Sequence, residues 1–207
     1  MNVTLAIGIV FLLLLINEWL WWDRPHGEAS RKFVHISVGT LVALWPLLLS
    51  WKQIELLSLA FVVGVIVSRQ FNIFKAIHAV ERPTWGELYF GASVGLIAIT
   101  THEPAIYAVA LLHMSLADGL AAVIGHAYGR KSVYRVFGAR KSGVGTLTFL
   151  VVSLAILTVF SVQQGISLGI WLPLLACSAA LLENIAVRGL DNLVIPLFIT
   201  LMLSSVI

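Results

Sequence analysis

Asp118 lies inside an apolar run of membrane length, residues 106–123, and a loop rich in glycine, arginine and lysine follows at 125–146. An ionisable side chain inside a bilayer is costly unless it is paired or hydrated, so it is a candidate functional group. The loop after it has the chemistry to hold phosphate groups, because basic side chains and successive backbone N–H groups both bind anions. Together the two features indicate a membrane enzyme that handles a phosphorylated ligand at the cytoplasmic face.

Small residues follow Asp118 at helical spacing: Ala121, Ala122, Gly125 and Gly129. The spacing of the two glycines permits close approach of either a neighbouring helix or a ligand. Two roles are open for Asp118. It is either a structural carboxylate paired inside the helix bundle, or a functional group that binds Mg²⁺ or orients an attacking hydroxyl.

The segment 141–146, with sequence KSGVGT, leads directly into another apolar run. Its glycines let N–H groups curl around an anion, the helix N-terminus adds a partial positive charge, and Lys141 adds a full one. The segment is not a Walker A loop, because the G-x-x-x-x-G-K-[ST] pattern does not occur in the chain. A cytoplasmic charge anchor with ordinary turn glycines is the alternative.

Charged residues also open two other apolar runs. Arg31 and Lys32, with His35 one turn later, have the chemistry to bind phosphate or an anionic substrate, or to contact lipid head groups. Glu87 is a further candidate, although it also fits a capping box with Thr84 at the start of a helix.

A short turn near the C-terminus lies between Glu183 and the pair Asp191-Asn192. These polar residues are candidate metal ligands, and a helix-end interaction is the alternative for Asp191. The remaining histidines show no metal-binding spacing such as H-E-x-x-H.

The composition indicates an integral membrane protein. Of 207 residues, 59% are hydrophobic and only 11% are charged, against about 25% charged in a soluble domain. The net charge of +3 is too small to indicate a nucleic-acid partner, and the lone Cys177 excludes an internal disulfide. Residues 1–22 lack a positively charged start, so we expect a retained transmembrane helix and not a signal peptide.

Eight apolar runs approach the roughly 20 residues that cross a bilayer as a helix. They cover residues 3–22, 33–50, 54–72, 84–101, 105–125, 144–162, 166–186 and 191–207. Backbone groups must be paired in lipid, so every run is expected to be helical. The predicted fold is an all-α polytopic integral membrane protein, with about eight transmembrane helices in one bundle and residues 1–207 as a single domain.

The basic residues predict the orientation of this bundle. With eight spans, 12 of the 13 Lys and Arg residues fall on one side and only Lys52 falls on the other. By the positive-inside rule the loops after the odd-numbered spans are cytoplasmic and both termini lie outside. The polar candidates described above converge on the same cytoplasmic side.

Five short motifs occur in order along the chain. They are Arg31-Lys32-Phe33-Val34-His35, Glu87 after a glycine, Asp118-Gly119 with Ala122, Gly125 and Gly129, Lys141-Ser142 with Gly145-Thr146, and Asp191-Asn192 with Pro196. In this order and spacing the chain resembles the CTP-dependent lipid-alcohol kinase family, which includes dolichol kinases, phytol and farnesol kinases and the CTP-using diacylglycerol kinase. That family in turn resembles the phosphatidate cytidylyltransferases in its nucleotide-binding half.

The resemblance runs from about Arg31 to Pro196, and the R-K-x-x-H opening leans towards the phytol and farnesol kinases. It implies CTP with Mg²⁺ as phosphoryl donor and an isoprenoid alcohol as acceptor. Family members often carry an acid or alanine in place of Val144 and a second aspartate in place of Leu190. These departures bear on the ligand set and the substrate more than on the reaction type.

On this hypothesis Asp118 and Lys141 are the catalytic residues. The set expected to bind the nucleotide is Arg31, Lys32, Gly119, Gly125, Gly129, Arg130, Lys131, Arg140, Lys141, Ser142, Gly145, Thr146 and Asn192. The candidate Mg²⁺ ligands are Asp118, Asp191, Glu87 and Glu183. His35 is expected to contact the alcohol, whose tail would lie in an apolar cleft between spans two, four and five.

Four rival functions are open. A cytidylyltransferase would join CMP to a lipid phosphate and release pyrophosphate, and a diacylglycerol kinase would differ only in its acceptor. An ion-coupled transporter would use Asp118 and Glu183 as relay groups, but it would need polar groups near the midplane and openings to both sides. A non-catalytic scaffold leaves the intramembrane acids unexplained.

Overall fold

The computed structural model of the chain describes residues 2–22, 28–71 and 85–206. Three of the predicted cytoplasmic charges, Arg24, Lys75 and Arg82, and also Thr84, lie outside the described residues.

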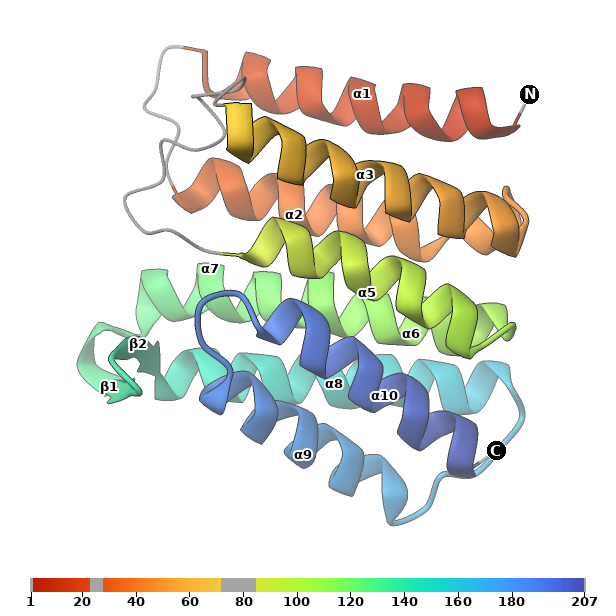
Figure 1. Cartoon of the computed structure of the whole chain (residues 1–207). Coiled ribbons are helices and arrows are strands. Elements are labelled where there is room, and N and C mark those ends of the chain that lie inside the picture. The colour runs from red at the N-terminus through yellow and green to blue at the C-terminus, as the bar shows by residue number, and fades with distance from the viewer. Residues whose placement is uncertain (1, 23–27, 72–84, 207) are drawn as a thin grey trace.

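The described residues are almost entirely helical (Figure 1). The long helices are α1 (Asn2–Leu20), α2 (Glu28–Ala43), α3 (Trp51–Phe71), α5 (Gly86–Thr100), α6 (Pro104–Leu112), α7 (Asp118–Tyr128), α8 (Gly143–Gln163), α9 (Trp171–Ile185) and α10 (Asp191–Val206). Short helical turns are η1 (Trp45–Leu47), η2 (His113–Ala117) and η3 (Arg130–Ser132). Each of the eight predicted apolar runs therefore contains a helix.

Four helical segments are long and apolar enough to cross a membrane, by length and composition. They are α1, α3, α8 and the continuous rod Pro104–Tyr128, which comprises α6, η2 and α7. Helices α5, α9 and α10 are apolar but have only 15, 15 and 16 residues. The helical prediction is thus confirmed, with four candidate spans among the described residues, while the count of about eight and the single domain stay predictions.

The rod from Pro104 to Tyr128 is the centre of the bundle. In its most apolar stretch 56% of the residues are buried, whereas the corresponding share is 11% in α1 and in α3. It packs against α2, α8 and α10, while α3 packs on α5 and α9 packs on α8 and α10. Inside this core the ring of His113 accepts or donates a hydrogen bond with Ser153 Oγ on α8 at 2.9 Å, so both buried polar groups are satisfied.

A short antiparallel hairpin joins α7 to α8, and the all-α prediction missed it. Strand β1 (Val133–Val136) pairs with β2 (Ala139–Ser142) through a two-residue turn at Phe137 and Gly138. Both turn residues have positive φ, 46° and 82°, as in the type I′ turns that favour Asn-Gly. Four-residue strands and a Phe-Gly turn carry little sequence signal, because periodicity needs longer segments and this turn pair is unusual.

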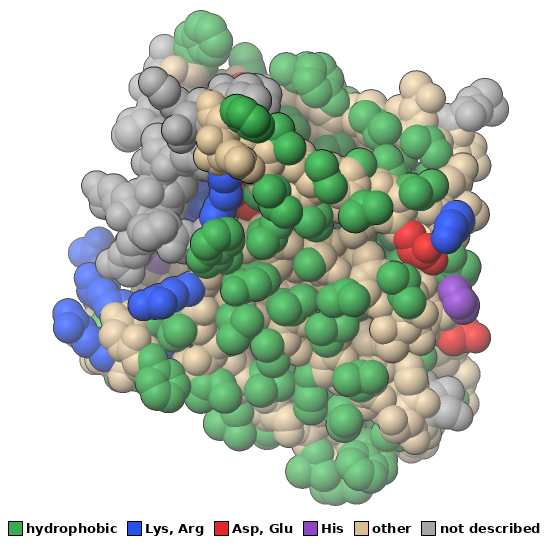
Figure 2. Space-filling model, in the orientation of Figure 1, with side chains coloured by type: hydrophobic (Ala, Val, Ile, Leu, Met, Phe, Trp, Pro, Cys, Tyr) green, Lys and Arg blue, Asp and Glu red, His purple; other side chains and the backbone are tan. Residues whose placement is uncertain are grey.

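The surface has the distribution of a membrane protein (Figure 2). Hydrophobic side chains cover the middle of the face shown, and Lys and Arg side chains gather at the hairpin end, on the left of the view. A smaller mixed group of charges lies at the opposite end. Trp19, Trp22, Trp85 and Trp171 are all exposed, as expected for residues near the ends of spans.

Candidate active site

Five elements that are distant in sequence each bring one charged side chain to the same region. We call Lys32 of α2, Asp118 of α7, Lys141 of β2, Glu183 of α9 and Asp191 of α10 the charged cluster. Asp191 lies within electrostatic range of the other four, and Asp118 lies within range of both lysines. The sequence-based prediction that these residues converge is therefore met by the geometry.

Asp118 and Lys32 form a buried ion pair. Lys32 Nζ donates to Asp118 Oδ2 at 2.7 Å, and only 11% and 7% of the two side chains are exposed. The pair joins residues 86 positions apart in the sequence. Removing one partner of such a pair leaves an uncompensated buried charge, which is strongly destabilising.

The turn before Asp118 is a π-helix, η2, set between two α-helices. The N–H of Asp118 donates to the carbonyls of His113 and Ser115 instead of that of Met114. The Met114 carbonyl accepts a hydrogen bond from His35 Nε2 at 2.9 Å, which fixes the proton on that nitrogen. His35 Nε2 also lies 3.6 Å from Asp118 Oδ2. Such π-helical turns occur frequently at functional sites.

Lys141 is held by Glu183 from two directions. Its Nζ donates to the Glu183 backbone carbonyl at 2.7 Å and also to the Glu183 carboxylate. Both side chains are mostly buried, with 16% and 8% exposed. The hairpin is thus attached to the C-terminal part of α9 through the residue that the sequence indicated as a phosphate ligand.

A polar network beside Lys141 was not predicted. Tyr134 Oη lies 2.6 Å from Thr146 Oγ1 and donates to Asn184 Oδ1, and Asn184 Nδ2 donates to Thr146 Oγ1 at 3.1 Å. The network joins β1, α8 and α9 and so fixes the position of the hairpin. The sequence did offer one sign of this network, because Asn184 stands next to Glu183 at the end of an apolar run. Its partner Tyr134 lies 50 positions away, so the sequence alone did not show that the two side chains meet.

Two buried oxygen atoms at the start of α10 have no hydrogen-bond partner among the described residues: Asp191 Oδ1 and Asn192 Oδ1. Asn192 Nδ2 donates to the Gly86 carbonyl at 3.2 Å, which orients the amide. Carboxylate and amide oxygens are suitable ligands for Mg²⁺, which is usually bound through one or two carboxylates plus phosphate oxygens and water. The described residues contain no group of three or more His, Cys, Asp or Glu arranged to hold a metal, so substrate phosphates would have to complete the coordination.

The ion pair of Glu87 is with Arg69, which does not belong to the charged cluster. Its Oε2 is 3.6 Å from Arg69 Nη2, and the Arg69 guanidinium lies 4.8 Å from the centre of the Trp85 ring. Helix α5 begins at Gly86 with Trp85 as N-cap and without a side-chain cap hydrogen bond. A role for Glu87 in metal binding stays a prediction.

The exposed basic residues of the predicted nucleotide set differ from Lys141 in their burial. Arg140 precedes Lys141 on β2, and successive strand residues face opposite sides. Arg140 is exposed while Lys141 is partly buried, and Arg31, Arg130 and Lys131 are exposed. Their predicted role in nucleotide binding is not tested by this arrangement.

The predicted anion-binding turn at the start of α8 is already occupied by hydroxyl groups. Ser142 is the N-cap, with its Oγ accepting from the Gly145 N–H at 3.1 Å, and Ser132 Oγ accepts from the Val144 N–H at 3.3 Å. Thr146 Oγ1 donates to the Ser142 carbonyl and belongs to the Tyr134 network. A phosphate bound here would have to displace a serine hydroxyl.

The glycines of this region serve close helix packing. A Cβ on Gly125 would lie 2.8 Å from Ser142 Oγ and 3.0 Å from Gly145 Cα, so α7 and α8 approach within backbone contact. A Cβ on Gly129 would also clash with Ser142, and one on Gly119 would clash with Ile36 of α2. Of the two roles left open for the glycine spacing, the structure shows contact with neighbouring helices.

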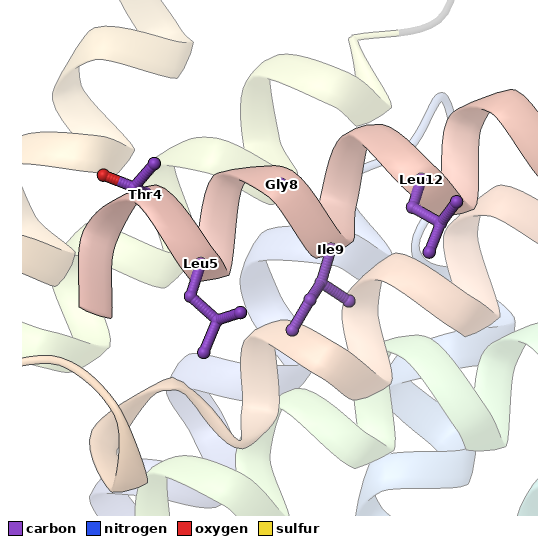
Figure 3. A pocket seen from close by; sticks show the side chains of 5 residues that line it. All are labelled: Thr4, Leu5, Gly8, Ile9 and Leu12. Atoms are coloured by element: carbon purple, nitrogen blue, oxygen red, sulfur yellow. The ribbon is translucent and has the colours of Figure 1, made fainter. Parts of the chain in front are cut away.

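A separate groove of 510 Å³ lies on the outer face of α1, far along the sequence from the charged cluster (Figure 3). It is lined by Thr4, Leu5, Gly8, Ile9 and Leu12. All five residues belong to one membrane-length helix, and none carries a charge. This apolar surface suits a lipid chain and offers nothing to bind a nucleotide.

Comparison with known proteins gives the reaction class. The phytol kinase of Synechocystis sp. is 34% identical to this chain over 180 residues, which covers 83% of the chain and 76% of the phytol kinase. The chain belongs to the lipid-alcohol kinase family. This lipid-alcohol kinase is accordingly an enzyme that phosphorylates an alcohol. No family model matches the chain, and no solved structure matches it.

Proposed function

We propose that the protein transfers the γ-phosphoryl group of CTP to the hydroxyl of an isoprenoid alcohol of the phytol type, at the cytoplasmic face of the membrane. The likeness to a phytol kinase supports the acceptor class, and the family resemblance supports CTP. The excess of Lys and Arg on one side of the predicted spans supports the cytoplasmic orientation.

The observation that carries the proposal is the charged cluster, which combines two lysines with three acids. Among the described residues, one oxygen of Asp191 and one of the neighbouring Asn192 have no hydrogen-bond partner. Phosphoryl transfer needs alignment of the reactants and neutralisation of the charge on the transferred group, and it needs little covalent help from the protein. A set of mutually paired charges can open to accept a charged ligand. Each lysine that leaves its acid gains phosphate oxygens in exchange.

We assign the side chains as follows. Lys141, and Lys32 when it leaves Asp118, bind the phosphates of the nucleotide. Asp118, which lies next to His35, accepts the proton of the alcohol as the oxygen attacks the γ-phosphorus. The bond from that phosphorus to the β–γ bridging oxygen breaks, and CDP leaves with the electron pair.

We assign Mg²⁺ binding to Asp191 and Asn192, through the two oxygens that lack hydrogen-bond partners among the described residues. When bound, the ion would neutralise charge on the phosphate oxygens. Glu183 holds Lys141 in place until the nucleotide arrives.

The hydroxyl end of the alcohol would approach along His35. The His35 ring packs edge-on against Phe90, with 5.9 Å between ring centroids, and Phe90 packs in the same manner against Phe61 of α3. These aromatic side chains border the site on the side of α3 and α5. We propose that the tail lies against these rings between the lipid and the charged cluster.

The test uses the purified protein in detergent with Mg²⁺ and CTP or ATP labelled in the γ-phosphate. The acceptor panel comprises phytol, farnesol, geranylgeraniol, dolichol and diacylglycerol. We expect label in a lipid monophosphate with CTP and with one of the first three alcohols. Transfer only from ATP would refute CTP as the donor, and transfer only to diacylglycerol would refute an isoprenoid alcohol as the acceptor.

A further inference from the structure

The β1–β2 hairpin presents two different faces. Tyr134 and Lys141, which are directly opposite in the strand register, belong to the polar interactions of the candidate active site. Arg135 and Arg140, the next pair in the register, are exposed on the other face. The contacts described for the charged cluster and for Tyr134 do not involve these two arginines.

The outer face concentrates positive charge. Arg135 and Arg140 are cross-strand partners, and like charges directly opposite each other destabilise a hairpin. Arg130 and Lys131 are exposed at its foot. No acidic residue occurs in the sequence between Asp118 and Glu183, and in the part of the chain that the structure describes none of these four residues has an ion-pair partner.

The tip of the hairpin carries an unusual residue. Phe137 has a φ of 46°, a left-handed conformation that is uncommon for an aromatic residue, and 81% of it is exposed. Asn would be favoured at this position of a type I′ turn. A backbone outlier that also exposes an aromatic ring is a reason to look for a function.

The hairpin must lie at a membrane surface. It occupies the 129–142 segment between two membrane-length segments, Pro104–Tyr128 and Gly143–Gln163. Figure 1 places it at one end of the bundle, and Figure 2 shows basic side chains gathered at that end. An exposed aromatic ring among basic side chains suits the head-group region, where aromatic rings partition and arginines bind lipid phosphates.

We propose that Arg130, Lys131, Arg135, Phe137 and Arg140, the hairpin patch, dock on anionic lipid head groups of the adjacent leaflet. A lipid phosphate bridges the two opposed arginines and removes their repulsion, while the Phe137 ring enters the interface. Lys141 lies on the inner face of the same hairpin, so docking of the outer face also holds Lys141 against α9. The proposal does not depend on the identity of the nucleotide or of the alcohol.

The test measures hydrogen–deuterium exchange of the backbone amides of residues 133–142 in the full chain. The protein is placed in nanodiscs of phosphatidylcholine alone or of phosphatidylcholine mixed with phosphatidylglycerol. We expect about fivefold slower exchange or more in the anionic discs, since one basic side chain near an anionic surface contributes a factor of about that size. The double variant Arg135→Gln/Arg140→Gln should lose this difference.

Two further variants separate docking from folding. Phe137→Asn suits the positive φ, so its thermal midpoint in detergent should equal or exceed that of the wild type while protection in anionic discs falls. Lys52→Gln removes an exposed lysine from the opposite side of the predicted bundle and should behave as the wild type. Equal exchange in both disc types for the wild type would overturn the proposal. The proposal would also be overturned if Phe137→Asn kept the full protection of the wild type in anionic discs. It would likewise be overturned if CTP protected the hairpin in neutral discs and the double arginine variant abolished that protection, because the arginines would then bind the nucleotide.

Discussion

At the scale of single residues, Asp118 has a structural role as the ion-pair partner of Lys32, and it is also adjacent to His35. In the proposed function Asp118 carries the chemical role as well, so the two roles left open by the sequence are compatible. A buried pair that opens for substrate offers a base and a phosphate ligand at once. Two variants test these roles separately.

Asp118→Asn should lower kcat by about 10²-fold or more, the contribution expected of a lost general base. It should also destabilise the protein, because Lys32 keeps a buried charge without a partner. The double variant Lys32→Met/Asp118→Asn removes that charge, so it should recover the thermal midpoint and remain inactive. Near-wild-type activity in purified, folded Asp118→Asn would refute the assignment.

Asp191→Ala should raise the Mg²⁺ concentration needed for half-maximal activity by about tenfold or more, since loss of a group that supports a metal costs at least that factor. The measurement is activity against Mg²⁺ at saturating nucleotide. Glu87→Gln is the matched control, because Glu87 pairs with Arg69 and should leave the Mg²⁺ dependence unchanged. A higher Mg²⁺ requirement in Glu87→Gln but not in Asp191→Ala would assign the metal site to Glu87 instead.

At the scale of elements, hydrophobicity placed a helix in each of the eight predicted apolar runs, because long apolar runs are a clear signal in a sequence, but only four helical segments of the described residues are long and apolar enough to cross a membrane. It did not give the hairpin, whose strands have only four residues each. Nor did it give the Lys32–Asp118 pair, because a contact across 86 positions depends on how α2 packs on α7. The sequence showed the glycine spacing, but only the packing of α7 on α8 showed that these glycines contact a neighbouring helix.

Gly125→Ala should destabilise the protein by about 1–3 kcal/mol, as expected when a methyl group is forced into a packed contact. The added Cβ meets Ser142 Oγ and the Gly145 backbone. Gly64→Ala on α3 is the control, because nothing lies within 4 Å of its Cβ position. Thermal unfolding in detergent measures both variants. Equal midpoints would show that α7 and α8 do not need this close contact.

At the scale of the whole molecule, the charged cluster and the hairpin patch lie on the predicted cytoplasmic side of the bundle. A lipid alcohol in the membrane and a nucleotide in the cytosol can meet only if this orientation is correct. The orientation follows from the distribution of Lys and Arg and has a direct test.

Single cysteines introduced into a Cys177→Ser background should report the topology. Val133→Cys on the hairpin should react with a membrane-impermeant thiol reagent only after the cells are permeabilised. Gln164→Cys, an exposed position after α8, should react in intact cells. Reaction of Val133→Cys in intact cells would place the hairpin outside and contradict the proposed site orientation.

Phosphoryl transfer from CTP to an isoprenoid alcohol is distinguished from other reactions by the position of the transferred phosphorus. Purified protein is incubated with phytol, Mg²⁺ and CTP that carries its label in either the γ- or the α-phosphate, and the lipid and aqueous products are separated. We expect γ-label in a lipid monophosphate and α-label only in the aqueous nucleotides, CDP and unreacted CTP. Label from the α-phosphate in the lipid would show nucleotidyl transfer and contradict the proposed reaction.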